Sequence, residues 1–200
     1  MEKKYKLTDE TIYINGSTLY RIEALKDFSD VKKGDKGGFV ENEDNLSQSD
    51  ECWVYDDAAV YGNARVFGGA IVCDNAIVRD NVVILTYAKI YDHAEVHYHA
   101  KVRGNAKVYG NAIVSDNAII YNNARIYGDA YVYDNARVCG DTYVYDNARV
   151  FGDAEVYGNA EVYDDTKVYG NAKVYGNAVV CDNAVVRDNA KVHGFAVVRE

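Results

Sequence analysis

Small apolar residues recur along this chain at a fixed spacing of six. From Val54 to Val198 every sixth residue is Val or Ile, and these 25 positions hold 21 Val and 4 Ile. A second series of 24 positions runs from Ala58 to Ala196 and is Ala at 21 of them, the exceptions being Val82, Thr142 and Thr166. A fixed period of this kind predicts a stack of equal structural units.

Each six-residue unit reads as a short strand followed by a bend. In Ala106–Tyr109 the small and branched residues alternate with polar or aromatic ones, which places Ala and Val on one side and Lys and Tyr on the other. The next position is Gly or Asp in 21 of 24 units, and the one after it is Asn in 14. These residues tolerate positive φ and favour turns, whereas the spacing fits no helix.

Three units close one turn of the stack. Bend residues 18 positions apart resemble one another more closely than adjacent bends do, with one series mostly Gly from Gly68 to Gly194 and another mostly Asp from Asp56 to Asp182. The sequence therefore predicts an all-β fold, a single-stranded parallel β-helix of triangular cross-section. Residues 52–200 account for about eight turns of 18 residues. The Val and Ala series face inward, with Cys52 inward at the start.

The first 51 residues follow a different pattern and form the first of two predicted segments, 1–51 and 52–200. Thr11–Ile14 and Ser17–Ile22, joined by Asn15-Gly16, predict a β-hairpin with a type I′ turn. The irregular stretch that follows is expected to cap the first turn and cover its open edge with Phe28, Phe39 and Trp53.

The hexapeptide V-x-[GD]-N-A-x resembles the hexapeptide-repeat family, whose fold is the left-handed parallel β-helix. The stretch IEALKDFSDVKKGDKGGFVENEDNLSQSDECWVYDDAAV, about residues 20–60, resembles the YdcK-like branch of that family. Proteins of this branch are often called transferases. The resemblance implies the left hand of the helix, against the general preference for right-handed crossovers, and it keeps a hexapeptide-repeat acyltransferase as an alternative function.

Charge narrows the choice of partner. The formal net charge is −9, from 22 basic and 31 acidic residues, and most acids of the repeat fall at the bends. One predicted corner carries Asp56, Asp74, Asp92, Asp129, Asp146, Asp164 and Asp182. This disfavours direct binding of nucleic acid. A basic protein partner would fit, and a second alternative is an acidic mimic of nucleic acid that inhibits a DNA- or RNA-binding protein, of phage or mobile-element origin. Asp also serves simply as a turn former.

Cysteine usage and hydropathy indicate a cytoplasmic protein. Cys73 and Cys181 are expected on one outer face six turns apart, Cys139 on another face and Cys52 inside, so no two can form a disulfide. No apolar run is long enough to cross a membrane, and the first residues lead into no signal peptide.

Catalytic residues are sparse. Hexapeptide-repeat acyltransferases use a catalytic His and loops extruded from the coils, and the repeat here is uninterrupted from Val54 to Val198. His93, His97 and His99 are the only clustered candidates, and their side chains are expected to diverge around the prism as solvent-exposed substitutions. We therefore expect no cofactor and no metal. The neighbourhood is nonetheless irregular, with Val82 inward and Thr86-Tyr87 and Tyr98-His99 at bends.

Aromatic residues give the strongest surface pattern. The residue after each repeat Val points outward, and Tyr91, Tyr109, Tyr127, Tyr145 and Tyr163 fall 18 residues apart on one face. Stacked rings at strand spacing stabilise a sheet, and they also offer a rigid recognition surface. The other faces carry shorter series, namely Tyr133, Phe151 and Tyr169, and Tyr157 and Tyr175.

These patterns together predict a non-catalytic β-helical scaffold or protein-binding module that presents aromatic faces and acidic corners. The last turn remains in repeat phase, and an uncovered turn exposes strand edges and apolar core. We expect a tail-to-tail homodimer through Phe195, Val197 and Val198, with a lateral trimer as the alternative.

Overall fold

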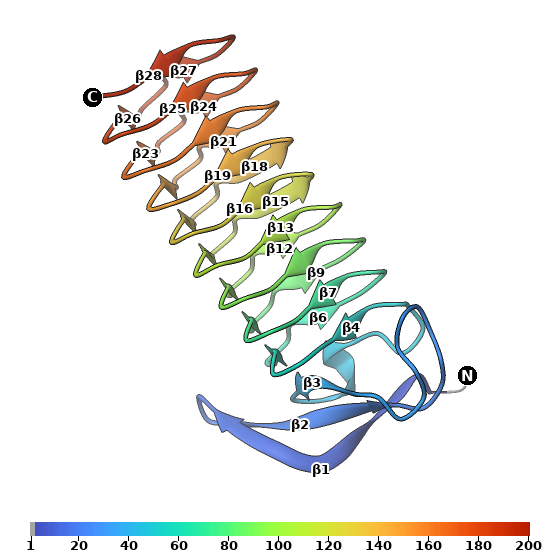
Figure 1. The fold of residues 1–200 in the computed structure, drawn as a ribbon. Coiled ribbons are helices and arrows are strands. Elements are labelled where there is room, and N and C mark those ends of the chain that lie inside the picture. Colours follow the sequence, from blue (N-terminus) through green and yellow to red (C-terminus); the bar gives the residue numbers. More distant parts are fainter. Residues whose placement is uncertain (1–2) are drawn as a thin grey trace.

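A computed structural model describes residues 3–200 as a triangular parallel solenoid of about nine turns with a small sheet at its N-terminal end (Figure 1). The two ends of the chain lie at opposite ends of the rod (Figure 1). Strands of successive turns pair in parallel at an offset of 18 residues, as Val108 does with Ile126. The predicted all-β fold and the 18-residue turn are thereby confirmed, while the left hand stays a prediction.

Three sheets form the sides of the prism, and we call their outer surfaces face I, face II and face III. Face I consists of β4 (Trp53–Val54), β7 (Ile71–Val72), β10 (Lys89–Ile90), β13 (Lys107–Val108), β16 (Arg125–Ile126), β19 (Tyr143–Val144), β22 (Glu161–Val162), β25 (Val179–Val180) and β28 (Val197–Val198). Face II consists of β5 (Ala59–Val60), β8 (Ile77–Val78), β11 (Glu95–Val96), β14 (Ile113–Val114), β17 (Tyr131–Val132), β20 (Arg149–Val150), β23 (Lys167–Val168) and β26 (Val185–Val186). Face III consists of β6 (Arg65–Val66), β9 (Val83–Ile84), β12 (Lys101–Val102), β15 (Ile119–Asn122), β18 (Arg137–Gly140), β21 (Glu155–Val156), β24 (Lys173–Val174) and β27 (Lys191–Val192).

The core is a thin column of small side chains. Every Val or Ile of the sixfold series from Val54 to Val186 is buried, and so is every member of the second series from Ala58 to Ala184, Val82 included. Cys52 is also buried, as predicted. In the last turn Ala190 and Ala196 are exposed because no further turn of the described chain lies on them.

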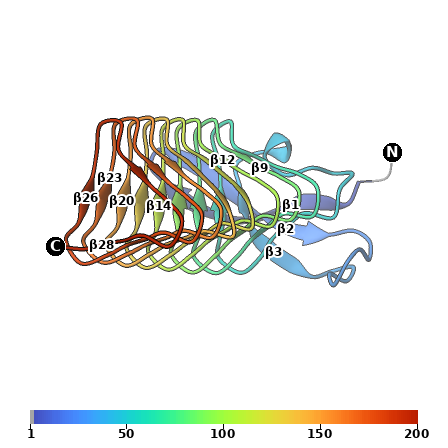
Figure 2. The same cartoon turned by 90° about the horizontal axis from the view of Figure 1, so that it is seen from above.

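The corners are held by a repeated backbone conformation, and Figure 2 shows them aligned from turn to turn. All 24 bend residues at the Gly/Asp position have positive φ, from 53° at Asp56 to 84° at Gly140. Gly, Asp and Asn reach this region at low cost, whereas Thr86 (66°) and Tyr98 (60°) do not. Backbone strain therefore collects around the neighbourhood that the sequence marks as irregular.

The N-terminal segment extends face II. β1 (Tyr5–Ile14) and β2 (Ser17–Ala24) pair antiparallel, with Ile14 opposite Ser17 and positive φ at both residues of the Asn15-Gly16 turn, so the predicted hairpin is confirmed. β3 (Lys36–Val40) pairs antiparallel with β2 and parallel with β5, and after the short helix η1 (Glu43–Asn45) Leu46 bridges to Val66. Residues before 52 thus supply the additional turn that counting from Cys52 omits.

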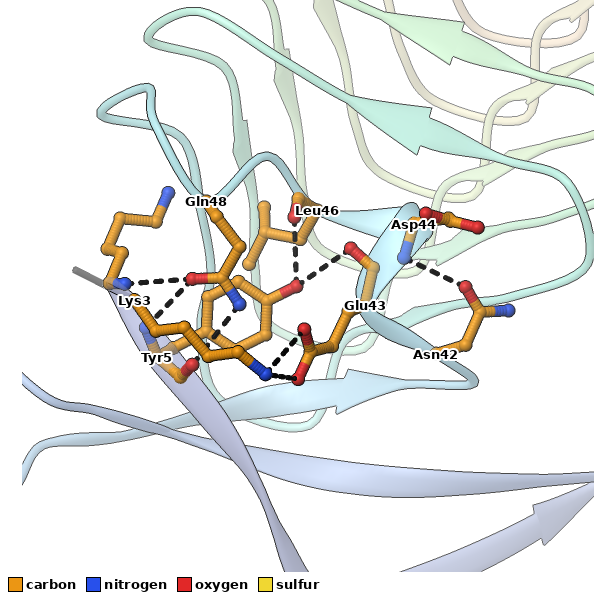
Figure 3. A network of polar contacts seen from close by, with 8 residues as sticks. Lys3, Tyr5, Asn42, Glu43, Asp44, Leu46 and Gln48 are labelled. Atoms are coloured by element: carbon orange, nitrogen blue, oxygen red, sulfur yellow. Dashed lines mark hydrogen bonds and ion pairs between the residues drawn. The ribbon is translucent and has the colours of Figure 1, made fainter. Parts of the chain in front are cut away.

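Aromatic and polar groups together close the N-terminal end of the core. The Trp53 ring is buried and meets Phe28 edge-on at 5.3 Å between centroids, as expected of a cap. Figure 3 shows the Tyr5 hydroxyl, which donates to the Leu46 carbonyl at 2.8 Å. The buried Lys4 ammonium donates to the backbone carbonyl of Cys52 at 2.8 Å.

The expectation that Phe39 covers the core is wrong. Phe39 is buried in a separate cluster with Leu19, Ala59 and Tyr61, between the hairpin and the outer side of face II. Alternation along β3 explains the difference, because Val40 takes the inward position and turns its neighbour outward. In residues 3–200 no helix is long and apolar enough to cross a membrane.

Candidate binding surface

Five tyrosine rings form a continuous stack along face I. Each ring follows the inward Val or Ile of its strand, so alternation turns it outward, and parallel pairing at 18 residues places it over the next ring. Successive centroids are 4.7–4.9 Å apart and ring planes differ by 2–13°. The predicted tyrosine ladder is therefore confirmed, and it consists of Tyr91, Tyr109, Tyr127, Tyr145 and Tyr163.

Stacking determines which parts of these rings reach solvent. A ring inside the ladder has both faces covered by its neighbours, and all five side chains are half-buried. Burial raises the pKa of Tyr91 to about 12 and also raises the pKa of Tyr109 and Tyr127. The phenols are consequently protonated at neutral pH, and the ladder presents ring edges and a row of hydroxyl groups that can donate and accept.

A row of cationic side chains runs beside the ladder. Lys89, Lys107 and Arg125 lie one residue before the inward position of β10, β13 and β16, and register pairing aligns them along the axis. The Arg125 guanidinium lies 5.2 Å from the centroid of the Tyr143 ring in the next turn. Face I therefore combines aromatic edges with positive charge.

Carboxylates line the corner between face I and face II, and several of them hold the backbone of the next turn. Asp56 accepts the N–H of Asp74 at 3.2 Å, and Asp92 accepts that of Gly110 at 3.0 Å. The same contact joins Asp164 to the N–H of Asp182 at 2.9 Å. The predicted acidic corner thus has a direct part in connecting successive turns.

Two further acids of this corner differ in their contacts. Asp129 accepts the side-chain amide of Asn111 at 3.0 Å, and Asp146 occupies a bend with a φ of 54°. A depression of about 570 Å³ next to Asp129 also contains Asp165, Arg149 and Lys167. Cations of face II therefore accompany the acids on this side of the corner.

The three clustered histidines do not converge. His93 and His99 are exposed at successive corners, as expected. His97 is 8% exposed, which corrects the prediction of an exposed side chain: its ring packs at 4.8 Å against the ring of Tyr98, which its strained bend turns alongside. Burial lowers the pKa of His97, and its Nδ1 has no hydrogen-bond partner among the described residues. Within residues 3–200 no group of three His, Cys, Asp or Glu side chains is placed to hold a metal.

The remaining faces carry shorter ladders. On face II the rings of Tyr133, Phe151 and Tyr169 stack at 4.8 Å. On face III Tyr157 and Tyr175 stack at 4.9 Å, and the His193 ring extends the stack at 5.1 Å. Sequence analysis treated His193 as remote and missed this continuation, although the 18-residue spacing from Tyr175 indicates it.

The residues expected at an oligomer interface are accessible. Phe195 is 85% exposed and Val197 59% exposed, and Val198 is half-buried against the core. All four cysteines are free: Cys52 is inside, Cys73 and Cys139 are half-buried on faces I and III, and Cys181 is buried beside the end of the ladder. The structure therefore places these groups where the repeat pattern predicts.

Comparison with known families agrees with this architecture. A family model described as the YdcK β-solenoid repeat matches residues 58–74, 106–122 and 167–182. The matched stretches lie in the solenoid and leave most of residues 20–60 outside. No curated protein matches the chain. The resemblance predicted from the sequence is confirmed, and the chain is a parallel β-solenoid that carries repeats of the YdcK type.

Proposed function

We propose that this protein is a rigid, non-catalytic scaffold that binds a protein partner along face I. Repeat architecture of this kind is that of a scaffold, because each turn contacts its neighbours and builds an extended regular surface. The observation that carries the proposal is the five-ring ladder, whose hydroxyl groups and ring edges lie in one row along the rod.

The ladder has the physical properties of a recognition surface. Tyrosine offers a large amphipathic contact area and has few torsions to immobilise on binding. Stacking between neighbours removes much of the remaining freedom before a partner arrives, so that less conformational entropy is lost in the complex. The side chains Tyr109, Tyr127 and Tyr145 lie at the centre of this surface, where partner contacts are expected to contribute most.

Flanking charge favours a polypeptide that lies along the rod. On one side of the ladder the partner meets Lys89, Lys107 and Arg125, and on the other it meets the acidic corner. A partner with basic groups aligned to that corner and acidic groups aligned to the lysines complements both rows. Charge of either sign alone would fit only half of the surface.

The two alternative functions have less support. An acyltransferase of the hexapeptide-repeat kind needs loops and an accessible histidine, whereas strand pairing continues without interruption and His97 is buried. A nucleic-acid mimic needs carboxylates that are free to replace phosphates, whereas those of Asp56, Asp92 and Asp164 accept backbone N–H groups.

A matched pair of triple variants tests the proposal. Tyr109→Ser, Tyr127→Ser and Tyr145→Ser remove three stacked rings from face I, while Tyr133→Ser, Phe151→Ser and Tyr169→Ser remove three stacked rings from face II. Affinity capture from native lysate should lose its specific partner with the first variant and retain it with the second. Equal capture by both variants would contradict the proposal, and circular dichroism confirms that both remain folded.

Self-association through the last turn is part of the same proposal. Phe195 and Val197 are exposed next to the uncovered Ala190 and Ala196, and an exposed strand edge pairs readily with a second chain. A two-fold, tail-to-tail arrangement would bury these groups in both copies. The scaffold would then present two copies of face I on one extended rod.

A further inference from the structure

A ligand pocket lies on face III, where a ring stack ends. Tyr157 is the first ring of the stack that continues through Tyr175 and His193. One side of the Tyr157 ring is covered by Tyr175, at 4.9 Å and 3° between planes. Its other side faces the preceding turn, in which Cys139 occupies the position where the ladder would place another ring. A thiol is too small to cover an aromatic face.

The missing ring leaves a measurable space. A hollow of about 290 Å³ is lined by Tyr121, Arg137, Cys139, Glu155 and Tyr157. On its far side the Tyr121 hydroxyl bonds with the Cys139 thiol, which raises the pKa of Tyr121. The other side of the Tyr121 ring is occupied by Arg103, whose guanidinium carbon lies 4.9 Å from the ring centroid.

The corresponding end of the face II stack is closed. Tyr131 lies 4.4 Å from Tyr133, and its hydroxyl is 3.3 Å from that of Ser115, the residue at the small position of that column. The face III hollow therefore differs from a simple end of a ladder, because a small residue there is combined with open space between two tyrosines.

The charges around the hollow select the sign of a guest. Glu155 is bound by Lys173 at 2.8 Å, whereas Arg137 is exposed and makes no ion pair among the described residues. Arg137 precedes the inward residue of the same strand as Cys139, so its guanidinium belongs to the turn in which the ring is missing. A guanidinium without a carboxylate partner complements an anionic group.

We propose that this hollow binds a planar aromatic ring carrying an anionic group, with the ring stacked on Tyr157 in the place of the missing ring and the anion bound by Arg137. The ring would continue the stack at the spacing that Tyr157 and Tyr175 already show. Offset stacking and burial of the ring supply the apolar part of the affinity, and the charge-assisted hydrogen bond orients it. This site lies on a different face from the proposed protein-binding surface and stands independently of it.

Titration of the whole protein by amide NMR tests the site. Naphthoate and adenosine monophosphate represent the two sources of an aromatic anion, a carboxylate and a phosphate, and cyclohexanecarboxylate has the charge without the aromatic plane. Amide signals of Tyr121, Arg137, Cys139 and Tyr157 should shift with at least one aromatic anion and not with cyclohexanecarboxylate. The tighter of the two identifies the preferred anion. Absence of shifts with both, or equal shifts with cyclohexanecarboxylate, would overturn the proposal.

Variants separate the hollow from the thiol and from the charge. Cys139→Tyr fills the missing position and should abolish binding while raising the melting temperature, whereas Cys139→Ala leaves the space open and should bind as before. Arg137→Gln should weaken binding roughly tenfold. Cys73→Tyr adds a ring on face I and should leave binding unchanged. Unaltered affinity in both Cys139→Tyr and Arg137→Gln would place the ligand elsewhere.

Discussion

The carboxylate of Asp74 accepts the backbone N–H of Asp92, the equivalent residue of the next turn, at 3.0 Å. The backbone at Asp74 has a φ of 59°, so the same residue satisfies the turn conformation and connects two turns. Asp is suited to both tasks because it tolerates the left-handed region and carries an ionised acceptor. The acidic corner is thus in large part a structural feature of the solenoid.

Replacing Asp74 separates these two contributions. Asp74→Ala removes the acceptor and places a Cβ residue without a polar side chain at positive φ, and should cost about 1–2 kcal/mol of unfolding free energy. Asp74→Asn keeps a neutral acceptor and a tolerated conformation, and should cost less. Denaturant midpoints of the two variants provide the measurement. Asp188, whose carboxylate accepts no backbone N–H in the described chain, is the control, and an equal loss in Asp188→Ala and Asp74→Ala would refute the hydrogen-bond account.

Two buried hydroxyl groups provide an opposite test. Thr142 and Thr166 occupy inward Ala positions, and their Oγ1 atoms are buried without a hydrogen-bond partner. Thr→Val at either position replaces the hydroxyl with a methyl group of similar size and should raise stability by about 1 kcal/mol. Thermal unfolding of the single and double variants checks this. A lower melting temperature in both single variants would mean that the hydroxyls are satisfied.

His97 should make stability depend on pH. Its pKa is lowered, mainly by burial and further by Arg79, from a reference value near 6.5. The unfolded chain therefore binds the proton at a higher pH than the folded chain, so stability is complete above about pH 6.5 and falls as pH drops toward the folded pKa. Melting temperature measured between about pH 7 and pH 5 should decline in the wild type and decline less in His97→Gln.

The neighbouring His99 supplies the control for this effect. His99 is exposed, so His99→Gln should retain the wild-type decline. The groups that oppose the shift of His97 are the nearby carboxylates of Glu95, Asp80 and Asp116. A pH profile that His97→Gln leaves unchanged would show that protonation of this imidazole does not limit stability.

Self-association gives a prediction at the C-terminal turn. Phe195→Asp with Val197→Lys introduces charge into the exposed apolar group and should convert a wild-type dimer to a monomer. Light scattering with size-exclusion chromatography measures the mass directly. A wild-type trimer would favour lateral association, and a monomer or a dimer insensitive to both changes would contradict the tail-to-tail arrangement.

Much of the fold could be predicted because each residue of the repeat has one function. Val108 is inward and Tyr109 outward by alternation, Gly110 supplies positive φ, and the period of 18 aligns Tyr109 with Tyr127. These are local rules that hold at every turn, so the sequence pattern alone specifies them. The cap is less regular, and there the strand phase was predicted incorrectly for Phe39.

Interactions between turns were harder to predict. Asn111 donates to Asp129, and Asn123 donates to Asp141, so these side-chain chains run toward the C-terminal end and stop at a residue that only accepts. This direction depends on amide orientation, which spacing does not encode. Burial of His97 depends in the same way on the strained bend of Tyr98, and the hollow beside Cys139 depends on the contacts of both adjacent turns.

The most direct test of the scaffold account locates the partner on the rod. A photoreactive benzophenone amino acid in place of Lys107 lies beside the ladder on face I, and the same residue in place of Lys101 lies at the equivalent position of face III. After irradiation in native lysate and mass spectrometry, the account predicts a specific crosslinked protein from the Lys107 position and none from the Lys101 position. Crosslinking of the same protein from Lys101 alone, or equally from both positions, would contradict it.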